Sequence, residues 1–566
     1  MKAKSNNKKY TANTDDLENT SDLYTAIGRR IPASVSCFVA QRPFLILVLR
    51  TGLIVAVFVL LDRFVMGVTH LPVSRFREPV LMLELVKSIG LAKLLILAAI
   101  GLVFLKHGHL LDRWKSLDHG RTVRWFVIFL ALLMTWPFTT YGYNYYFDQG
   151  HFLDRGVLAV LLVLLWFRPV FIYPFLLLAF TLMWQFATPG LGGVVLAHKL
   201  QVLQVLNLFA AAFLLHSFSG KREMQGFVFL TCCMIAGSYW EAAIAKLELG
   251  WLTYGHLYRT VLAAYGHGWL GSMSPPTIVD FSQLLSRLDW PIRIFVLVIE
   301  AGFLVFLWRR VVSIVLLVAI IVFHCAVFVL YGFLFWTWIL LDVALLMLLV
   351  YERHAADLQL FDRRRLALSI PLIVLAAVWA RLPHLGWLDM PVSYATRYTV
   401  IGESGKQYSL SPRFFEPYGD VFTMSSFGYL VKDHGVLTGP YGVTRDIELA
   451  DRMSGNITAK DVFAMESNTD MNRYDPDRAK RYYDFVSAYL HHWNMHAGEK
   501  PDLSVVGPPP QFWTTVTGES YVGQEPVREL VVNEVTTLFD GKRLDVIRDQ
   551  ELARIQIPTA AMDTAK

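Results

Sequence analysis

The chain has 566 residues, of which 55% are hydrophobic, 14% aromatic and only 17% charged. Soluble globular proteins carry about 25% charged residues, so this composition predicts an integral membrane protein and excludes a disordered, fibrous or disulfide-rich chain. The formal net charge is +6. Many of the basic residues lie in short connectors between apolar runs, as a membrane topology signal requires, so we do not expect nucleic-acid binding.

The apolar runs predict eleven membrane spans. Residues 1–43 form a polar segment, and the first apolar run begins near Phe44, which is too late and too long for a cleaved signal peptide. A bilayer core needs about 20 apolar residues per helix. By this measure the spans lie near residues 44–66, 87–105, 125–139, 156–167, 170–186, 202–218, 226–246, 291–307, 311–331, 334–350 and 366–383. Arg168-Pro169 interrupts 156–186, which is therefore either a tight helical hairpin or one long broken helix.

The basic connectors predict the orientation. With the N-terminal segment in the cytoplasm, the basic loops 106–124, 219–225 and 351–365 also fall on the cytoplasmic side. Two spans within 156–186 keep this alternation. An odd number of spans then places residues 384–566 outside the cytoplasm.

The C-terminal region changes character. Residues 398–410 alternate around a glycine-containing turn and predict a β-hairpin, and Leu530–Ile547 predicts a second one around Asp540-Gly541. Residues 477–493 have helical periodicity. The predicted fold is an all-α polytopic membrane bundle over residues 44–383, followed by an extracytoplasmic α+β domain over 384–566.

Ionisable residues at membrane depth are functional candidates because each is costly unless it is paired or hydrated. The candidates are Arg50, Asp62, Lys93, Glu241, Lys246, Glu300, His324 and Asp342, with His151 at the outer mouth of the fourth span. Structural interpretations stand beside the functional ones. Asp62 precedes Arg63 near a helix end and is able to reach the interface, and Arg50 is able to form an ion pair with Asp62 or Glu300.

Lys246 lies near the outer end of a span rich in small residues. A lysine that is deprived of water becomes a usable general base near neutral pH. The alternative is that Glu241 or Glu248 pairs with Lys246 and keeps it charged. His324 lies deep in an apolar run without any metal-ligand spacing, so we expect no metal site.

A family resemblance follows from these residues. The stretch Tyr239-Trp-Glu-Ala-Ala-Ile-Ala-Lys246-Leu, closing on Trp251, resembles the Tyr-x-x-Ala-Gly-x-x-Lys-Leu…Trp signature of vitamin K-dependent γ-carboxylases and the wider HTTM membrane family. The resemblance covers roughly residues 44–350. Weaker landmarks in the family's order are Leu49-Arg50-Thr-Gly, Asp148-Gln-Gly-His151-Phe-Leu, Glu300-Ala-Gly-Phe and Phe323-His324-Cys325.

The resemblance implies a carbon–carbon lyase that couples the oxygenation of reduced vitamin K, a menaquinol-type hydroquinone, to carboxylation of glutamyl residues. Dioxygen and carbon dioxide are co-substrates, and the polypeptide substrate is an exported one. Lys246 matches the base that deprotonates the hydroquinone, and His151 matches the histidine that assists at the substrate carbon. We expect the pocket to be lined by Glu241, Glu300, His324, Trp251 and Arg50.

Two alternatives to this function remain. One is a quinone-linked oxidoreductase or oxygenase that does not carboxylate. The other is a non-catalytic component of an envelope complex that binds lipid or quinone.

Overall fold

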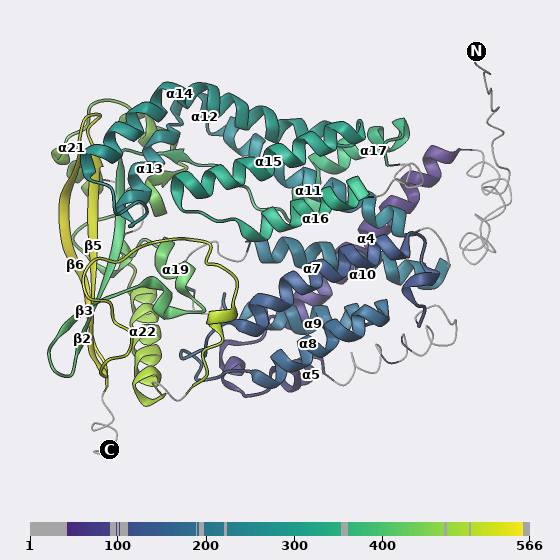
Figure 1. Cartoon of the computed structure of the whole chain (residues 1–566), viewed down its shortest axis with the longest axis horizontal. Coiled ribbons are helices and arrows are strands. Elements are labelled where there is room, and N and C mark those ends of the chain that lie inside the picture. Colours follow the sequence, from purple (N-terminus) through teal and green to yellow (C-terminus); the bar gives the residue numbers. More distant parts are fainter. Residues whose placement is uncertain are drawn as a thin grey trace, which may run out of the picture.

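The computed structural model describes residues 42–90, 98, 101, 111–187, 190–191, 197–219, 223–351, 360–468, 473–496 and 500–558. Its helices form an elongated bundle, and a four-stranded sheet stands across one end of that bundle (Figure 1). The chain is mostly helical, with a sheet region towards its C-terminus, as the sequence predicts.

The bundle is built from long helices. They are α4 (Pro43–Thr69), α5 (Leu81–Ile89), α7 (Gly120–Thr140), α8 (Phe152–Phe167), α9 (Ile172–Trp184), α10 (Ala197–Ser219), α11 (Glu223–Glu248), α14 (Pro275–Gly302), α15 (Arg310–Tyr331), α16 (Trp336–Tyr351) and α17 (Arg363–Val374), followed by the short α18 (Ala376–Trp379). Among the described residues, five helices are long and apolar enough to cross a membrane, namely α4, α7, α10, α11 and α15. Each coincides with a predicted span. Most of the predicted span 87–105 lies outside the described residues.

The burial of these helices separates the centre of the bundle from its periphery. The most apolar stretch is 89% buried in α10 and 72% buried in α11, but only 17% in α4 and 28% in α15. On α15 the exposed side chains Val311, Val315, Val318 and Val322 follow one helical stripe. Such a stripe suits contact with lipid. Because α10 and α11 are the most buried of these helices, they form the core around which the other helices pack.

The interruption predicted at Arg168-Pro169 is present. Helix α8 ends at Phe167, Arg168 is extended, and a 3-10 turn over Pro169–Phe171 leads into α9. Helix α9 then packs against α8. This arrangement fits the predicted hairpin, and the total of eleven spans remains a prediction.

Helix α14 is longer than the span predicted at 291–307. It begins at Pro275, where the side chain of Ser274 accepts a hydrogen bond from the backbone N–H of Thr277. Trp290 and Trp308 are both more than half exposed. Trp290 lies within α14, whereas Trp308 lies beyond the end of the helix at Gly302 and the 3-10 turn Phe303–Val305. Helix α14 therefore begins 16 residues before the predicted span.

The main sheet has the strand order β3-β2-β5-β6 and is antiparallel throughout. Its strands are β2 (Val392–Gly402), β3 (Gln407–Leu410), β5 (Val527–Phe539) and β6 (Leu544–Gln556), and a two-stranded sheet pairs β1 (Leu388–Asp389) with β4 (Val443–Thr444). Both predicted hairpins are confirmed. Tyr398 of β2 pairs with Leu410 of β3, and β5 and β6 flank the turn that contains Asp540-Gly541.

The predicted helix at 477–493 is also confirmed as α22 (Pro476–His496), which buries Tyr482, Phe485 and Tyr489. These rings share a hydrophobic core with Val400, Leu530 and other residues of the sheet. The remaining helices of this region are α12 (Trp251–Tyr254), α13 (Leu257–Gly266), α19 (Gly419–Met424), α20 (Ile447–Arg452) and α21 (Ala459–Asn468).

The sheet region also includes chain segments from before residue 384. Tyr143 and Tyr145, in the connector between α7 and α8, belong to the same hydrophobic core as α22. His492 donates a hydrogen bond from Nδ1 to the carbonyl oxygen of Tyr145 at 2.7 Å, across 347 residues of sequence. The connectors of the bundle and the C-terminal region therefore fold together.

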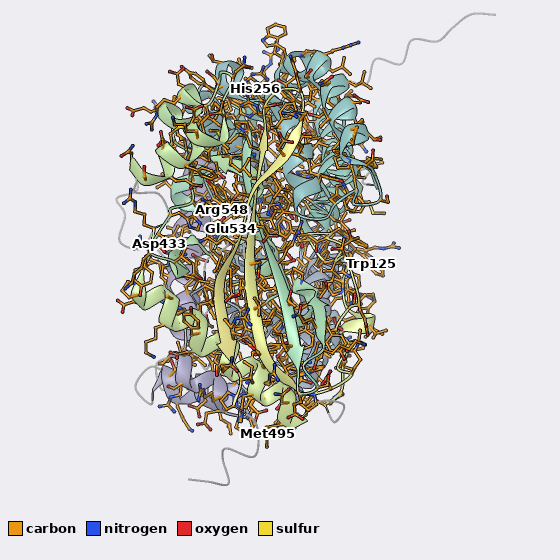
Figure 2. The ribbon with its side chains drawn as sticks, turned by 90° about the vertical axis from the view of Figure 1, so that its left-hand side faces the viewer. Trp125, His256, Asp433, Met495, Glu534 and Arg548 are labelled. Carbon is orange, nitrogen blue, oxygen red and sulfur yellow. The ribbon has the colours of Figure 1, made fainter. Side chains whose placement is uncertain are left out.

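Charged side chains near the middle of the sheet are paired. Figure 2 shows Glu534 and Arg548 there, on the neighbouring strands β5 and β6. Arg548 donates to both carboxylate oxygens of Glu466 at 2.7 and 2.8 Å, and His434 lies 3.1 Å from Glu534. These pairs fasten α21 and the loop around His434 to the sheet.

Candidate functional site

Lys246 and Glu300 form a buried ion pair. Lys246 lies in the last turn of α11, and Glu300 lies near the end of α14. The Nζ atom of Lys246 is 2.7 Å from Oε1 and 2.8 Å from Oε2 of Glu300, and the two side chains are only 11% and 5% exposed. Glu300 is therefore the partner of Lys246, in place of Glu241 or Glu248. A pair at this depth is screened little by solvent, so its two charges depend on each other.

Trp251 covers this ion pair. Helix α11 ends at Glu248, and Gly250, two residues later, has the left-handed backbone (φ +63°) that is typical of a glycine following a helix. The turn brings the ring of Trp251 to 5.6 Å from Nζ of Lys246, within the range of a cation–π contact. Arg293 fixes this turn by donating to the carbonyl oxygens of Trp251 and Leu252, at 2.9 and 2.7 Å.

A second polar cluster lies deeper along α11. Tyr239 precedes Lys246 by seven residues, or about two helical turns, and so shares its face of the helix. The hydroxyl of Tyr239 donates to Oδ2 of Asp342 at 2.5 Å, and Nδ1 of His324 is 3.9 Å from the same oxygen. The ring of His324 stacks on Trp338 at 5.9 Å. The structure thus brings the Phe-His-Cys element and Asp342 to the helix that carries Lys246.

The two clusters form one polar face lined by aromatic rings. On the face of the helix between Tyr239 and Lys246 lie the small buried side chains Ala242 and Ala243. The ring of Phe303 lies 4.5 Å from that of Tyr239, and Phe335 lies 5.7 Å from His324. Such a face provides a lysine and carboxylates for proton transfer and aromatic surface for a planar ligand.

Glu241 belongs to a different cluster. Nδ1 of His384 lies 2.6 Å from its Oε1 atom, and Nε2 of the same ring lies 3.2 Å from Oε2 of Glu248. His384 lies in the segment between α18 and β1, so these contacts link α11 to the start of the sheet region. Within the described residues, no group of three or more His, Cys, Asp or Glu side chains is placed to hold a metal ion.

His151 lies apart from the Lys246 pair. It precedes α8 with a left-handed backbone (φ 48°), and its Nε2 atom donates to the carbonyl oxygen of Phe76 at 3.0 Å. Its Nδ1 atom is buried without a hydrogen-bond partner among the described residues. Burial, and then the charge of Arg155, lowers the pKa of His151 to about 4. The imidazole is therefore neutral at pH 7, and its contact places it beside the segment around Phe76.

Arg50 does not form the predicted ion pair. Asp62, twelve residues later on α4, lies 3.7 Å from Nη1 of Arg381 and accepts a hydrogen bond from Asn207 at 3.3 Å. Glu300 is taken by Lys246. Twelve residues separate two side chains by about 18 Å along a helix, so Arg50 and Asp62 are too far apart to form an ion pair.

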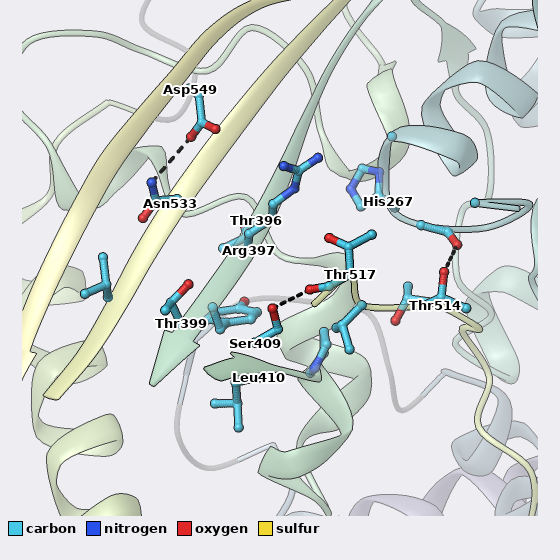
Figure 3. A pocket seen from close by; sticks show the side chains of 18 of the residues that line it. His267, Thr396, Arg397, Thr399, Ser409, Leu410, Thr514, Thr517, Asn533 and Asp549 are labelled. Carbon is cyan, nitrogen blue, oxygen red and sulfur yellow. Dashed lines mark hydrogen bonds between the residues drawn. The ribbon is translucent and has the colours of Figure 1, made fainter. Parts of the chain in front are cut away.

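A cleft of about 650 Å³ lies elsewhere, on the sheet. It is lined by polar and apolar side chains of β2, β3, β5 and β6 and by the loops around His267 and Thr515 (Figure 3). None of the residues predicted for the membrane site lines it. The sequence signal for this cleft is the placing of polar residues on one side of a strand, as in Arg397 and Thr399 of β2.

Comparison of the chain with protein family models, with curated proteins and with solved structures found no match.

Proposed function

We propose that this protein is a membrane enzyme that uses a reduced quinone of the vitamin K type, and that it carboxylates glutamyl residues of an exported polypeptide. The observation that carries the proposal is the buried Lys246–Glu300 pair beneath Trp251. Ionisable groups at membrane depth are expensive to keep and are functional by default. The resemblance of the Tyr239–Trp251 stretch to the γ-carboxylase signature supports the same assignment.

The donor set of this site fits a hydroquinone. Tyr239, Phe303 and Trp338 offer aromatic surface, while Lys246 with Glu300, and Asp342 with His324, offer hydrogen-bonding groups at two depths. A planar aromatic ring with hydroxyl groups uses both features. When bound, the hydroquinone would supply the electrons that reduce dioxygen, and its oxidation would provide the base strength that removal of the glutamyl γ-proton needs. Lys246, Glu300 and Tyr239 are the residues that would hold it.

The contribution of the protein is to hold and move one proton. Glu300 lies within hydrogen-bond distance of Nζ of Lys246 and can accept its proton, which leaves a neutral amine. That amine is then able to take a proton from an acidic hydroxyl next to it. Trp251 and the turn fixed by Arg293 keep water from the pair, which protects a strong base from being quenched. His151 lies apart from this pair and bonds to the carbonyl of Phe76. The proposal therefore rests on Lys246 and Glu300 and gives His151 no role.

The topology completes the proposal. We place the N-terminal segment in the cytoplasm, count eleven spans, and put the sheet region outside the cytoplasm, where an exported polypeptide would reach it. The basic connectors support this orientation. The proposed site then lies where the last turn of α11 meets the C-terminal part of α14, with access for a lipid-soluble quinone from the bilayer.

One observation favours a non-catalytic alternative. Both oxygens of Glu300 contact Lys246, so the pair is complete without any ligand. A complete pair suits a structural tie between α11 and α14 in a membrane component that binds lipid or quinone. A quinone-linked oxidoreductase without carboxylation would use the same residues as the main proposal and differs from it in its products alone.

The deciding experiment uses purified protein with reduced vitamin K, dioxygen, labelled bicarbonate and a glutamate-rich peptide. Quinone epoxide and fixed label are both measured, in wild type, in Lys246→Ala and in Glu300→Gln. We expect both products in wild type and neither in the two variants. Lys480→Ala, which removes an exposed lysine that is also ion-paired, serves as the matched control and should retain both.

Other outcomes assign the alternatives. Epoxide without fixed label in wild type contradicts carboxylation and supports the oxidoreductase. Neither product with several quinones, or undiminished products in Lys246→Ala, contradicts the role of Lys246.

A further inference from the structure

Two adjacent valines project from the surface of the C-terminal region. Val505 is 86% exposed and Val506 is 62% exposed. Val505 has the largest exposed fraction of any large apolar side chain in the described part of the chain. Both lie in the 3-10 turn Ser504–Val506, which buries none of its side chains. A single exposed valine is ordinary, so the position of this pair decides whether it has a partner.

The turn is fastened to a membrane helix. The indole N–H of Trp136 donates to the carbonyl oxygen of Val506 at 2.8 Å. Trp136 lies near the end of α7, one of the helices apolar enough to cross a membrane, and one turn after Leu132, which is 51% exposed. The ring centroid of Trp136 is 5.8 Å from that of Trp336, the first residue of α16. Tryptophan is enriched at membrane interfaces, so this pair is typical of the level at which apolar helices leave the bilayer.

Helix α15 marks the same level independently. Its exposed valines continue from Val311 to Val329, which is 64% exposed. These two valines are 18 residues apart on one helix, or about 27 Å, which is close to the bilayer-core thickness of about 30 Å. The apolar surface of α15 thus ends near Val329, just before the helix ends at Tyr331. We therefore place the membrane interface at the turn between α15 and α16.

The segment that carries the two valines is also bonded to that turn. Trp513 N–H donates to the carbonyl oxygen of Gly332 at 3.0 Å, and Leu334 N–H donates to that of Gln511 at 2.8 Å. Gly332 and Leu334 lie between α15 and α16. Residues 506–513 are therefore tied at both ends to the end of the bundle that meets the sheet region (Figure 1).

The chemistry of the segment suits contact with lipid. Residues 503–518 contain no charged side chain. The N–H groups of Ser504, Val506 and Gly507 are hydrogen-bonded locally, at 2.8, 3.1 and 2.9 Å. Residues 508–510 are prolines, which have no N–H. An unpaired backbone N–H is a main cost of placing a turn among lipids, and this segment has paired or lacks most of them.

We infer that the turn Ser504–Val506 inserts the side chains of Val505 and Val506 into the lipid interface on the side of the sheet region. The partner is the bilayer itself, through its acyl chains, because an uncharged segment has no group that selects a charged headgroup. Insertion is shallow, at the boundary between headgroups and acyl chains, so a side chain at position 505 stays reachable from that side. The inference goes beyond the proposed function and holds whether or not the protein acts on a quinone.

The test measures the surroundings of the turn directly. Full-length protein with its four native cysteines replaced receives the single change Val505→Cys. It is labelled with the polarity-sensitive fluorophore NBD and reconstituted into phosphatidylcholine nanodiscs. Phosphatidylcholine that carries a nitroxide near the top of one acyl chain serves as the quencher. We expect blue-shifted emission at position 505 and loss of most of the fluorescence with the nitroxide lipid.

Val522→Cys is the matched control. Val522 is also an exposed valine, at 76%, but it follows Tyr521, whose N–H donates to the carbonyl oxygen of Ser409 on β3. Its label should emit as in water and keep its fluorescence.

A second variant separates insertion from nearness to lipid. Val506→Asp, made in the Val505→Cys protein, places a charge in the turn, and a charge is costly at membrane depth. It should restore water-like emission and most of the fluorescence at position 505. Thermal unfolding of each variant shows whether it is folded.

Three results would overturn the inference. Equal emission and equal quenching at positions 505 and 522 would mean that the turn lies in water. Quenching at position 505 that Val506→Asp leaves unchanged would mean that the turn lies near lipid without inserting. Blue-shifted emission without quenching would mean that a protein surface, from a second copy or another partner, covers the valines. The assay involves neither quinone nor product, so its outcome is separate from that of the proposed reaction.

Discussion

Removing one partner of the Lys246–Glu300 pair should destabilise the protein far more than removing both. The two side chains are 11% and 5% exposed and are joined by two contacts of 2.7 and 2.8 Å. Either single change leaves a buried charge without its partner, which costs about 3–5 kcal/mol. Replacing both with apolar residues of similar size is close to neutral.

The experiment is a double-mutant cycle with Lys246→Met, Glu300→Leu and the double variant. Unfolding of the detergent-solubilised protein is followed by tryptophan fluorescence against denaturant. We expect each single variant to lose about 3 kcal/mol or more, and the double variant to recover most of that loss.

Lys480 and Asp484 provide the matched control cycle. Their charged atoms are 2.6 Å apart, a similar distance, but the side chains are 74% and 61% exposed on α22. A surface pair of this kind contributes about 0.5 kcal/mol or less. If the effects of the two membrane variants simply add, within about 0.5 kcal/mol, the pair does not hold α11 and α14 together and the argument from burial is refuted.

Three further predictions address other parts of the fold. Burial raises the pKa of Asp389 from 3.8 to about 6, so its protonated form stabilises the fold below about pH 4, and this contribution is lost as the pH rises through 6. Asp389→Asn should therefore make the midpoint of thermal unfolding depend less on pH between pH 4 and 7. The same pH dependence in the variant and in wild type would contradict this. Tyr239→Phe leaves Asp342 without its donor and should lower the free energy of unfolding by about 1–3 kcal/mol, measured by denaturant titration, whereas an unchanged value would mean that water replaces the hydroxyl. In a chain without native cysteines, Arg168→Cys should react with a membrane-impermeant thiol reagent only from the cytoplasmic side, and the exposed Val505→Cys only from the other side; labelling from the same side would refute the topology.

Local patterns were sufficient to predict the elements of the sheet region. Two-residue alternation predicted the hairpin around 398–410, and the Asp540-Gly541 turn predicted the second hairpin. Helical periodicity predicted α22. Each of these signals acts over fewer than about twenty residues, and each element in the structure extends a few residues further because tertiary packing continues beyond the pattern.

The site was predicted only in part, because its contacts join distant segments. The motif on α11 identified Lys246 and Trp251, which do lie together. The pairing of Lys246 with Glu300 spans 54 residues and depends on how α11 and α14 cross, which no local spacing encodes. Glu241 and Glu248, five residues before Lys246 and two residues after it, contact His384 instead. The cleft on the sheet was missed because hydrophobic alternation predicts which face of a strand is buried, but not what the open face binds.

The joining of early and late segments in one core has a consequence for synthesis. The carbonyl of Tyr145 receives its hydrogen bond from His492 only after 347 more residues have been made. At about 5–20 residues per second, this connector stands without its partner for roughly 20 to 70 seconds. During that interval Tyr143 and Tyr145 expose aromatic surface that the finished protein buries. We therefore expect this connector to need shelter, at the membrane surface or from a chaperone, until α22 has been synthesised.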